Sequence, residues 1–166
     1  MCYYHSYILD PGPWPPVTTS SRFAVSLHIL TLLETQDGRP VTSDYVAASV
    51  NTNPVVVRRL ISMLHRAGLV TSQLGAGGGA LLAKPAASIR LIDVYRAVEP
   101  GSLFAMHRSP PNPNCPVGAH IQAALKTAMG RAEAAFEEEL AETRLSDIAR
   151  SVGARAKPRA RVASRG

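Results

Sequence analysis

The stretch that decides the fold is residues 42–84, which read TSDYVAASVNTNPVVVRRLISMLHRAGLVTSQLGAGGGALLAK. Its middle holds Asn53 and Pro54, which mark the start of a helix, because Asn is a good N-cap and Pro has no N–H to leave unpaired. Apolar residues then recur at helical spacing as far as Ala67. The glycine that follows suits the left-handed residue with which many helices end. We therefore predict a helix from Pro54 to Ala67.

Shorter elements flank this helix on both sides. Before it, Thr42 and Ser43 can cap a short helix over residues 43–50. After it, residues 69–72 and 80–83 read as two strands, and the run GAGGG between them can form a tight hairpin tip but cannot pack a core. Helix, turn, helix and glycine-tipped hairpin, in this order, are the plan of a winged helix-turn-helix domain.

Two more helices are expected to complete this domain, which we place at residues 20–98. The first covers residues 20–35 and is capped by Ser20 or Ser21. The second is capped by Ser88. Its apolar face is formed by Leu91, Val94, Tyr95 and Val98. The expected fold class is thus mainly α with one small β-hairpin.

A proline-rich loop over residues 99–115 leads into a long helix that begins at Pro116, with Cys115 as its N-cap residue. Apolar residues follow one another in this helix at steps of three or four over about six turns. They are Val117, Ile121, Leu125, Ala128, Ala132, Phe136 and Leu140. Because a single helix cannot bury such a stripe on itself, we expect it to need a partner. With a short helix that follows, it forms a second unit at residues 116–150.

Both ends of the chain are expected to be disordered. Residues 1–19 hold four prolines around Trp14, a density that blocks helix and sheet. Val17 is an alternative start of translation, because a GUG codon there would be read as methionine, and residues 1–16 would then not be translated. Residues 151–166 are expected to form a basic tail.

The net charge of +6 comes from this tail rather than from the folded body. Residues 150–166 carry six Lys and Arg and no acid, so the rest of the chain is neutral overall. Within the body, residues 41–84 carry four Lys and Arg against Asp44 alone, whereas residues 132–142 carry five Glu and no base. A basic and an acidic segment in one neutral body indicate two faces with different partners.

The basic segment coincides with the helix-turn-helix, which points to double-stranded DNA as a partner. In this motif the second helix lies in the major groove with its N-terminal residues leading, and Arg is a good reader of guanine. Hydroxyls and backbone N–H groups at helix starts can meet phosphates. The candidate DNA contacts are Thr42, Ser43, Thr52, Asn53, Val55, Arg58, Arg59, Gly75, Gly77 and Gly78. The alternative is a winged-helix module that binds another protein and whose basic face is merely solvated.

Other function classes find little support in the sequence. No apolar stretch is long enough to span a membrane and no secretory signal opens the chain, so we expect a cytoplasmic protein. Two cysteines are too few for a disulfide scaffold. The glycine run is followed neither by Gly-Lys-Ser/Thr nor by a helix start, so it is no phosphate-binding loop. Since no catalytic motif stands out either, we do not expect an enzyme.

Residues 64–82, LHRAGLVTSQLGAGGGALL, resemble a signature stretch of the Rrf2 family of bacterial winged-helix transcriptional regulators. The segments SSRFAVSLHIL, NPVVVRRLISML, SIRLIDVYRAVE and NPNCPVGAHIQ fit the same family in the same order, so the resemblance covers about residues 20–150. It implies a sequence-specific regulator, with repression as the expected mode. It also implies a homodimer that pairs through the long helix and binds pseudo-palindromic operators.

The sequence departs from many of these relatives at two places in the DNA-binding segment. Arg58 and Arg59 stand where many relatives have Glu-Gln, and Leu74 stands where they have an Arg in the hairpin. Because Glu accepts a hydrogen bond from cytosine and Arg donates to guanine, we expect a different operator rather than a loss of DNA binding.

A further departure concerns cysteine. Cluster-binding relatives carry three cysteines in the loop before the long helix, whereas residues 99–116 contain Cys115 alone. Iron–sulfur clusters usually need four ligands, so we expect neither a cluster nor another metal or cofactor. Cys115 itself stands at a helix N-terminus, whose dipole lowers the pKa of a thiol. It is either a redox-sensing thiol or a buried, inert one.

Overall fold

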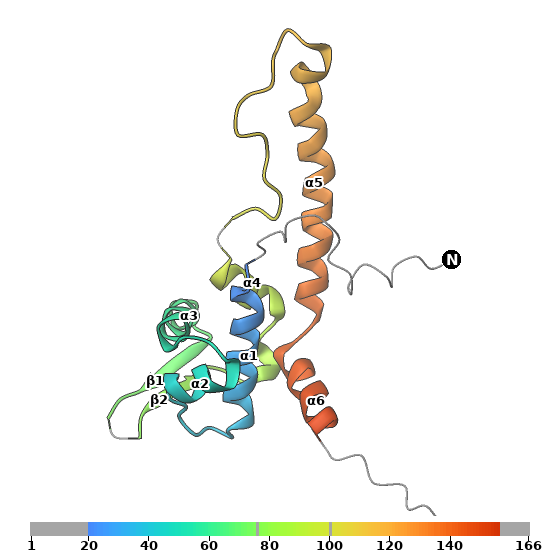
Figure 1. Ribbon diagram of the computed structural model, residues 1–166. Helices are drawn as coiled ribbons and strands as arrows, with labels where there is room; N and C mark the ends of the chain where they lie inside the picture. The colour runs from blue at the N-terminus through green and yellow to red at the C-terminus, as the bar shows by residue number, and fades with distance from the viewer. Residues whose placement is uncertain (1–19, 76, 100, 157–166) are drawn as a thin grey trace, which may run out of the picture.

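Helix α1 (Arg22–Thr35) runs through the middle of the folded body in the computed structural model, which describes residues 20–75, 77–99 and 101–156 (Figure 1). Ile29 and Leu30 are completely buried, and the helix packs against α2, α3, α4, α6 and strand β2. Of the two expected caps, Ser21 is the N-cap residue but its side chain makes no cap hydrogen bond, whereas the Oγ of Ser20 accepts from the N–H of Arg22 at 3.2 Å. Because neighbours surround most of α1, its apolar residues are spread around the helix rather than confined to one stripe, whereas Arg22, Ala24, His28 and Thr35 remain exposed.

The predicted helix-turn-helix is confirmed by α2 (Ser43–Val50) and α3 (Pro54–Arg66). Thr42 Oγ1 accepts from the N–H of Tyr45 at 3.3 Å and caps α2. Asn53 Oδ1 accepts from the N–H of Val55 at 2.8 Å and caps α3. Both caps are therefore the residues that the sequence indicates, and Gly68 follows α3 with a φ of 67°.

The hairpin consists of antiparallel strands β1 (Val70–Gln73) and β2 (Gly79–Leu82), each within one residue of its predicted position. A third backbone segment, which the sequence did not indicate, joins them at Val41. Its N–H donates to the carbonyl of Ala80 at 3.0 Å, and the N–H of Ala80 donates back at 2.8 Å. These two bonds hold the hairpin against the start of the helix-turn-helix.

Helix α4 (Leu91–Val98) begins later than predicted, and Ser88 is not its cap. Ser88 lies instead in a short 3-10 turn (Ala86–Ser88), where its N–H donates to the carbonyl of Pro85 at 2.8 Å. The N-cap is Arg90, whose backbone N–H donates to the Asp93 carboxylate at 3.2 Å. The prediction was wrong because the N–H groups that a Ser88 cap would bind are used elsewhere: that of Arg90 donates to Asp93, and that of Leu91 donates to the carbonyl of Thr143 at 3.0 Å.

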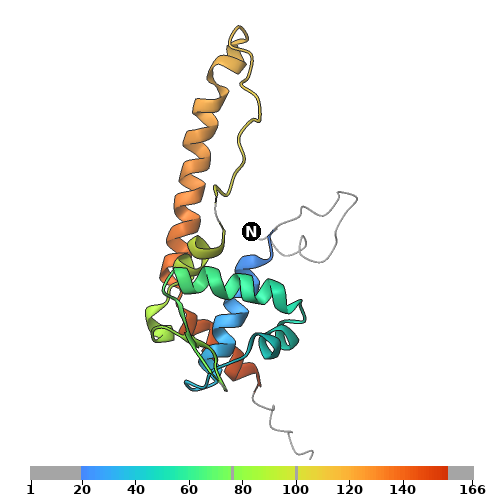
Figure 2. The same ribbon diagram turned by 90° about the vertical axis from the view of Figure 1, so that its left-hand side faces the viewer.

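Helix α5 (Pro116–Glu142) projects from the body as an arm of about 40 Å, at 1.5 Å per residue, and the loop over residues 101–115 runs beside it (Figures 1 and 2). The loop is fixed to the arm by Glu133, which accepts hydrogen bonds from the hydroxyl of Ser102 and from the N–H of Phe104. The helix thus starts at the predicted residue, and Cys115 is its N-cap residue.

Helix α6 (Leu145–Ala156) turns back onto α1 and belongs to the body rather than to the arm. Leu145 is completely buried, and its N–H donates to the carbonyl of Ile89 at 2.9 Å. Because this packing anchors the helix, residues 151–156 are helical, and the prediction that they belong to a disordered tail was wrong. The predicted leader over residues 1–19 and the tail from residue 157 onward lie outside the described residues. No helix in the described part of the chain is long and apolar enough to cross a membrane.

The contact between β2 and Val41 gives a prediction for Gly79→Ala. A Cβ at this position would lie 2.5 Å from the carbonyl oxygen of Val41, so the backbone must shift. We expect a loss of about 1–3 kcal/mol in the free energy of unfolding, measured by urea denaturation at fixed protein concentration. Gly153→Ala in α6 is the control, because open space surrounds it, and it should change stability by no more than about 1 kcal/mol, in the stabilising direction. Equal stability of Gly79→Ala and the unsubstituted protein would contradict the prediction.

Candidate nucleic-acid interface

One face of α3 is exposed along its whole length. Val55, Arg59, Ser62 and Arg66 follow one another at helical spacing and are all exposed; we call them the outer stripe of α3. The opposite face packs into the core through Val57, Leu60 and Leu64. Burial of one face therefore fixes which side chains the helix presents to a partner.

The two predicted arginines have different surroundings. Arg58 lies to one side of the outer stripe, and its guanidinium forms an ion pair with Asp44 of α2 at 3.3 Å. Arg59 lies on the stripe itself and has no hydrogen-bonded or ion-paired partner among the described residues. An exposed ion pair of this kind contributes little to stability, but it sets the direction of the Arg58 side chain. Arg59 is thus the arginine that is free for an external partner.

A shallow depression of about 310 Å³ extends this face from α3 to the start of α2 and to β1. It is lined by Ser43, Arg58, Ile61, Ser62, His65, Arg66 and Ser72. Sequence reasoning did not select Ser62, His65, Arg66 or Ser72. A projection of the helix from Arg59 would have found Ser62 and Arg66, whereas Ser72 carries no such signal, because its place depends on how the hairpin packs.

The start of α3 differs from the predicted phosphate site. Pro54 has no N–H, the N–H of Val55 is bonded to the Asn53 side chain, and the N–H of Val56 donates to the Asn53 carbonyl at 3.0 Å. Thr52 is half-buried, and its N–H donates to the carbonyl of Ala47. At α2, by contrast, Thr42 Oγ1 serves as an acceptor in its cap, so its hydroxyl proton remains available to a phosphate.

The glycines of the hairpin tip follow from the geometry of the turn. Gly75 and Gly77 have φ values of 95° and 77°, which other residues rarely adopt. A Cβ on Gly78 would lie 2.3 Å from the carbonyl oxygen of Gln73. Leu74 beside them is 91% exposed. The glycines therefore close the turn, and their contact with DNA stays a prediction.

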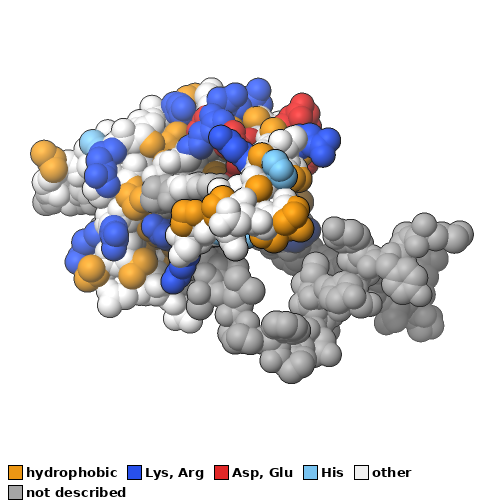
Figure 3. All heavy atoms as spheres, turned by 90° about the horizontal axis from the view of Figure 1, so that it is seen from above, with side chains coloured by type: hydrophobic (Ala, Val, Ile, Leu, Met, Phe, Trp, Pro, Cys, Tyr) orange, Lys and Arg blue, Asp and Glu red, His pale blue; other side chains and the backbone are white. Residues whose placement is uncertain are grey.

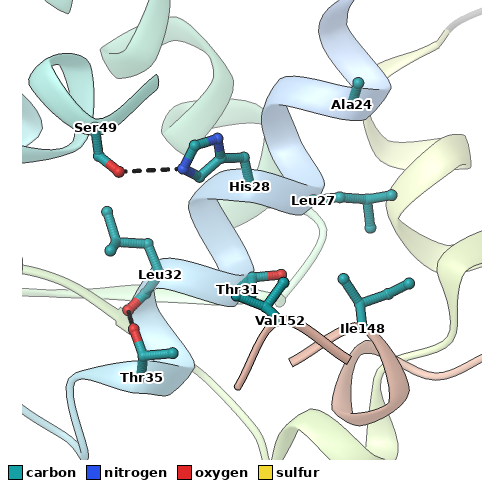
Figure 4. A pocket seen from close by; sticks show the side chains of 9 residues that line it. All are labelled: Ala24, Leu27, His28, Thr31, Leu32, Thr35, Ser49, Ile148 and Val152. Atoms are coloured by element: carbon teal, nitrogen blue, oxygen red, sulfur yellow. Dashed lines mark hydrogen bonds between the residues drawn. The ribbon is translucent and has the colours of Figure 1, made fainter. Parts of the chain in front are cut away.

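An apolar groove of about 560 Å³ lies between α1 and α6, away from the outer stripe (Figure 4). At its rim His28 of α1 forms a hydrogen bond of 3.1 Å between Nε2 and the hydroxyl of Ser49 on α2. Figure 4 shows the imidazole reaching across from α1 to the Ser49 hydroxyl. His28 therefore links α1 to α2, the helix that precedes α3.

Cys115 is exposed at the start of α5, so the buried alternative was wrong. The backbone N–H of Gly118 and then that of Val117 lower the pKa of its thiol, because both stabilise the negative charge of the thiolate. This agrees with the expected effect of a helix N-terminus on a cysteine.

The described residues do not supply the donor set of an iron–sulfur cluster. The chain has two cysteines, Cys2 and Cys115, and Cys2 lies outside the described residues. Across residues 20–75, 77–99 and 101–156, no three His, Cys, Asp or Glu side chains are grouped so that they could hold a metal ion.

Together, the helix-turn-helix, the hairpin beside it and the basic outer stripe define a winged-helix protein of the DNA-binding class. The comparisons with known proteins give the family. Residues 19–151 match the Rrf2 family, described as "Iron-dependent Transcriptional regulator". The chain belongs to this family of transcriptional regulators.

Individual relatives agree with this assignment. YwnA of Bacillus subtilis strain 168, named as an HTH-type transcriptional regulator, is 47% identical over 130 residues, which are 78% of this chain and 95% of YwnA. A crystal structure named as that of a DNA-binding protein is 45% identical, with a TM-score of 0.63 over 77% of this chain and 98% of that one. CymR, the global cysteine regulator of B. subtilis, is 26% identical, with a TM-score of 0.62 over 81% of this chain and 98% of that one.

Proposed function

We propose that this protein is a homodimeric, sequence-specific DNA-binding repressor that works without an iron–sulfur cluster. The observation that carries the proposal is the outer stripe of α3, an exposed row of side chains with two arginines on the second helix of a helix-turn-helix. Its family supports DNA as the partner. A regulator of this kind acts on chromosomal DNA, which places it in the cytoplasm, and has no catalytic role.

In this proposal α3 enters the major groove with Val55 leading and Arg59 one turn behind. Arg59 can donate two hydrogen bonds to a guanine, while Arg66 reaches a phosphate. Thr42 and Ser43, at the start of α2, are placed for the flanking phosphates. The hairpin tip approaches the neighbouring minor groove with backbone and Leu74 rather than with a cation.

The arm supports the proposed dimer. No side chain of α5 is fully buried within the chain, and Val117 is 67% exposed. The body end of the stripe is already covered, since Phe136 packs edge-to-face on Tyr95 of α4 with ring centroids 5.2 Å apart. The outer half, formed by Val117, Ile121, Leu125 and Ala128, remains for a second copy. Figure 3, which looks down on the tip of the arm, shows hydrophobic side chains exposed there.

A dimer gives a simple route to repression, because two copies of α3 on adjacent half-sites occupy a promoter and exclude other proteins. We further propose that Cys115 makes this occupancy sensitive to oxidants. Its exposed thiol has a lowered pKa, and peroxide converts a thiolate to sulfenic acid with release of hydroxide. The change would occur at the tip of the arm, where the second copy is proposed to lie.

DNA binding is tested with duplexes selected from a randomised pool, by fluorescence anisotropy across a range of salt concentrations. We expect the Arg59→Ala/Arg66→Ala variant to lose at least about tenfold in affinity and to show a salt slope that is smaller by about one per lost phosphate contact. Arg131→Ala on α5 removes the same kind of charge away from the outer stripe and should bind normally. Failure to select any duplex would favour the alternative, a module that binds proteins.

The dimer is tested by sedimentation velocity on Leu125→Glu. A carboxylate in the middle of the proposed interface should give a monomer, because burying an unpaired charge is far more costly than the contact gains. Ala123→Glu places the same charge on the opposite side of α5 and should remain a dimer. Equal sedimentation of both variants and the unsubstituted protein would contradict the proposal that the arm forms the dimer interface.

The thiol proposal predicts a pH profile and a loss of DNA binding, both measured in a Cys2→Ser background. Because its pKa is lowered, Cys115 should react with iodoacetamide with a midpoint below the value of about 8.5 for a free cysteine. Peroxide should weaken DNA binding of this protein and leave the Cys115→Ser variant unaffected. The same response to peroxide in both proteins would rule out Cys115 as the sensor.

A further inference from the structure

Exposed large apolar side chains in the described part of the chain gather mainly in two regions. Leu103, Met106 and Val117 belong to the arm and its loop, where the proposed dimer would cover them. Tyr45, Val55, Val56 and Leu74 lie instead on α2, on the first turn of α3 and at the hairpin tip. Of this second group, Val55 belongs to the outer stripe that we assign to DNA, where a purely electrostatic contact would call for a polar residue.

Val55 is the foremost of these side chains. It is 65% exposed, stands at the first turn of α3 and belongs to the outer stripe, while Val56 beside it is 44% exposed. In a helix-turn-helix the N-terminal residues of the second helix approach the base edges in the major groove. An isopropyl group at this position can neither donate nor accept a hydrogen bond.

The backbone at the same place is also closed to polar readout. The N–H groups of Val55 and Val56 are both bonded to Asn53, and Pro54 has none. The start of α3 therefore presents two isopropyl groups and no free backbone donor from these residues. What it can recognise is an apolar feature of the DNA.

We propose that Val55 recognises the C5-methyl group of a thymine in the major groove, an inference that rests on the proposed DNA binding. This methyl is the apolar group that the base edges present there. Arg59 lies four residues further along the same stripe, about 6 Å along the helix axis. The preferred half-site therefore combines this thymine with a nearby guanine.

The experiment changes the DNA rather than the protein, so folding is not at issue. Each thymine of a selected duplex is replaced in turn by deoxyuridine, which removes only the methyl group, and the Kd is measured by fluorescence anisotropy. At one position per half-site we expect binding to weaken about fourfold, which is about 0.8 kcal/mol at 1.4 kcal/mol per factor of ten. The Val55→Ala variant, whose side chain is two methyl groups smaller, should lose most of the difference between the thymine and uracil duplexes at this position. Val152→Ala, which shortens an exposed valine on α6, should keep the full difference.

The outcomes separate this inference from the proposed function. If the protein binds DNA but no single replacement by uracil weakens binding, or if Val55→Ala keeps the fourfold difference, recognition of the methyl by Val55 is overturned and DNA binding stands. If no duplex is bound at any salt concentration, both are overturned. Placing 5-methylcytosine at the sensitive position should restore part of the binding that plain cytosine loses, because it returns the methyl group.

Discussion

Helix α1 carries apolar residues around most of its circumference, and burying them requires cover from several directions. Ile29 and Leu30 are fully buried, and the cover comes from both parts of the chain: α2, α3, α4 and β2 before the arm, and α6 after it. The backbone bond between Leu145 and Ile89 closes this core immediately after the arm ends. The segments before and after the arm therefore share one core, and the arm projects from this core without contributing a buried side chain to it.

This shared core also explains how the exposed surface is divided. The residues that α1 buries on α3 are Val57, Leu60 and Leu64, so the opposite residues must face outward. On α5, Phe136 lies at the end of the apolar stripe nearest the body and packs on Tyr95. The end of the stripe at the tip of the arm is left free by this contact. Two separate surfaces result, one on α3 and one on the arm, and they suit two kinds of partner.

Local signals in the sequence were enough to predict the helices and strands, but they did not predict how these elements contact one another. The Asn53 cap, the proline after it and the glycine after α3 act within one turn of chain, so they could be read correctly. Three features could not be read in this way: the pairing of Val41 with β2, the start of α4 at Leu91, and the packing of α6. Each depends on segments that meet only in the folded chain. The same holds for the site, where Arg58 and Arg59 look alike in sequence and differ once Asp44 lies beside one of them.

The different surroundings of Arg58 and Arg59 change how these two departures from other family members are interpreted. By the resemblance, Arg58 stands where many relatives have Glu, and Arg59 stands where they have Gln. The exchange of Glu for Arg changes the charge of the side chain more than the exchange of Gln for Arg does. Yet Arg58 is paired with Asp44 beside the outer stripe, whereas Arg59 lies on the stripe. On the outer stripe, which we propose to face DNA, the exchange is therefore the one from Gln to Arg, and such an exchange favours guanine over adenine. We expect the altered operator to follow from position 59 rather than from position 58, where Asp44 pairs with the guanidinium.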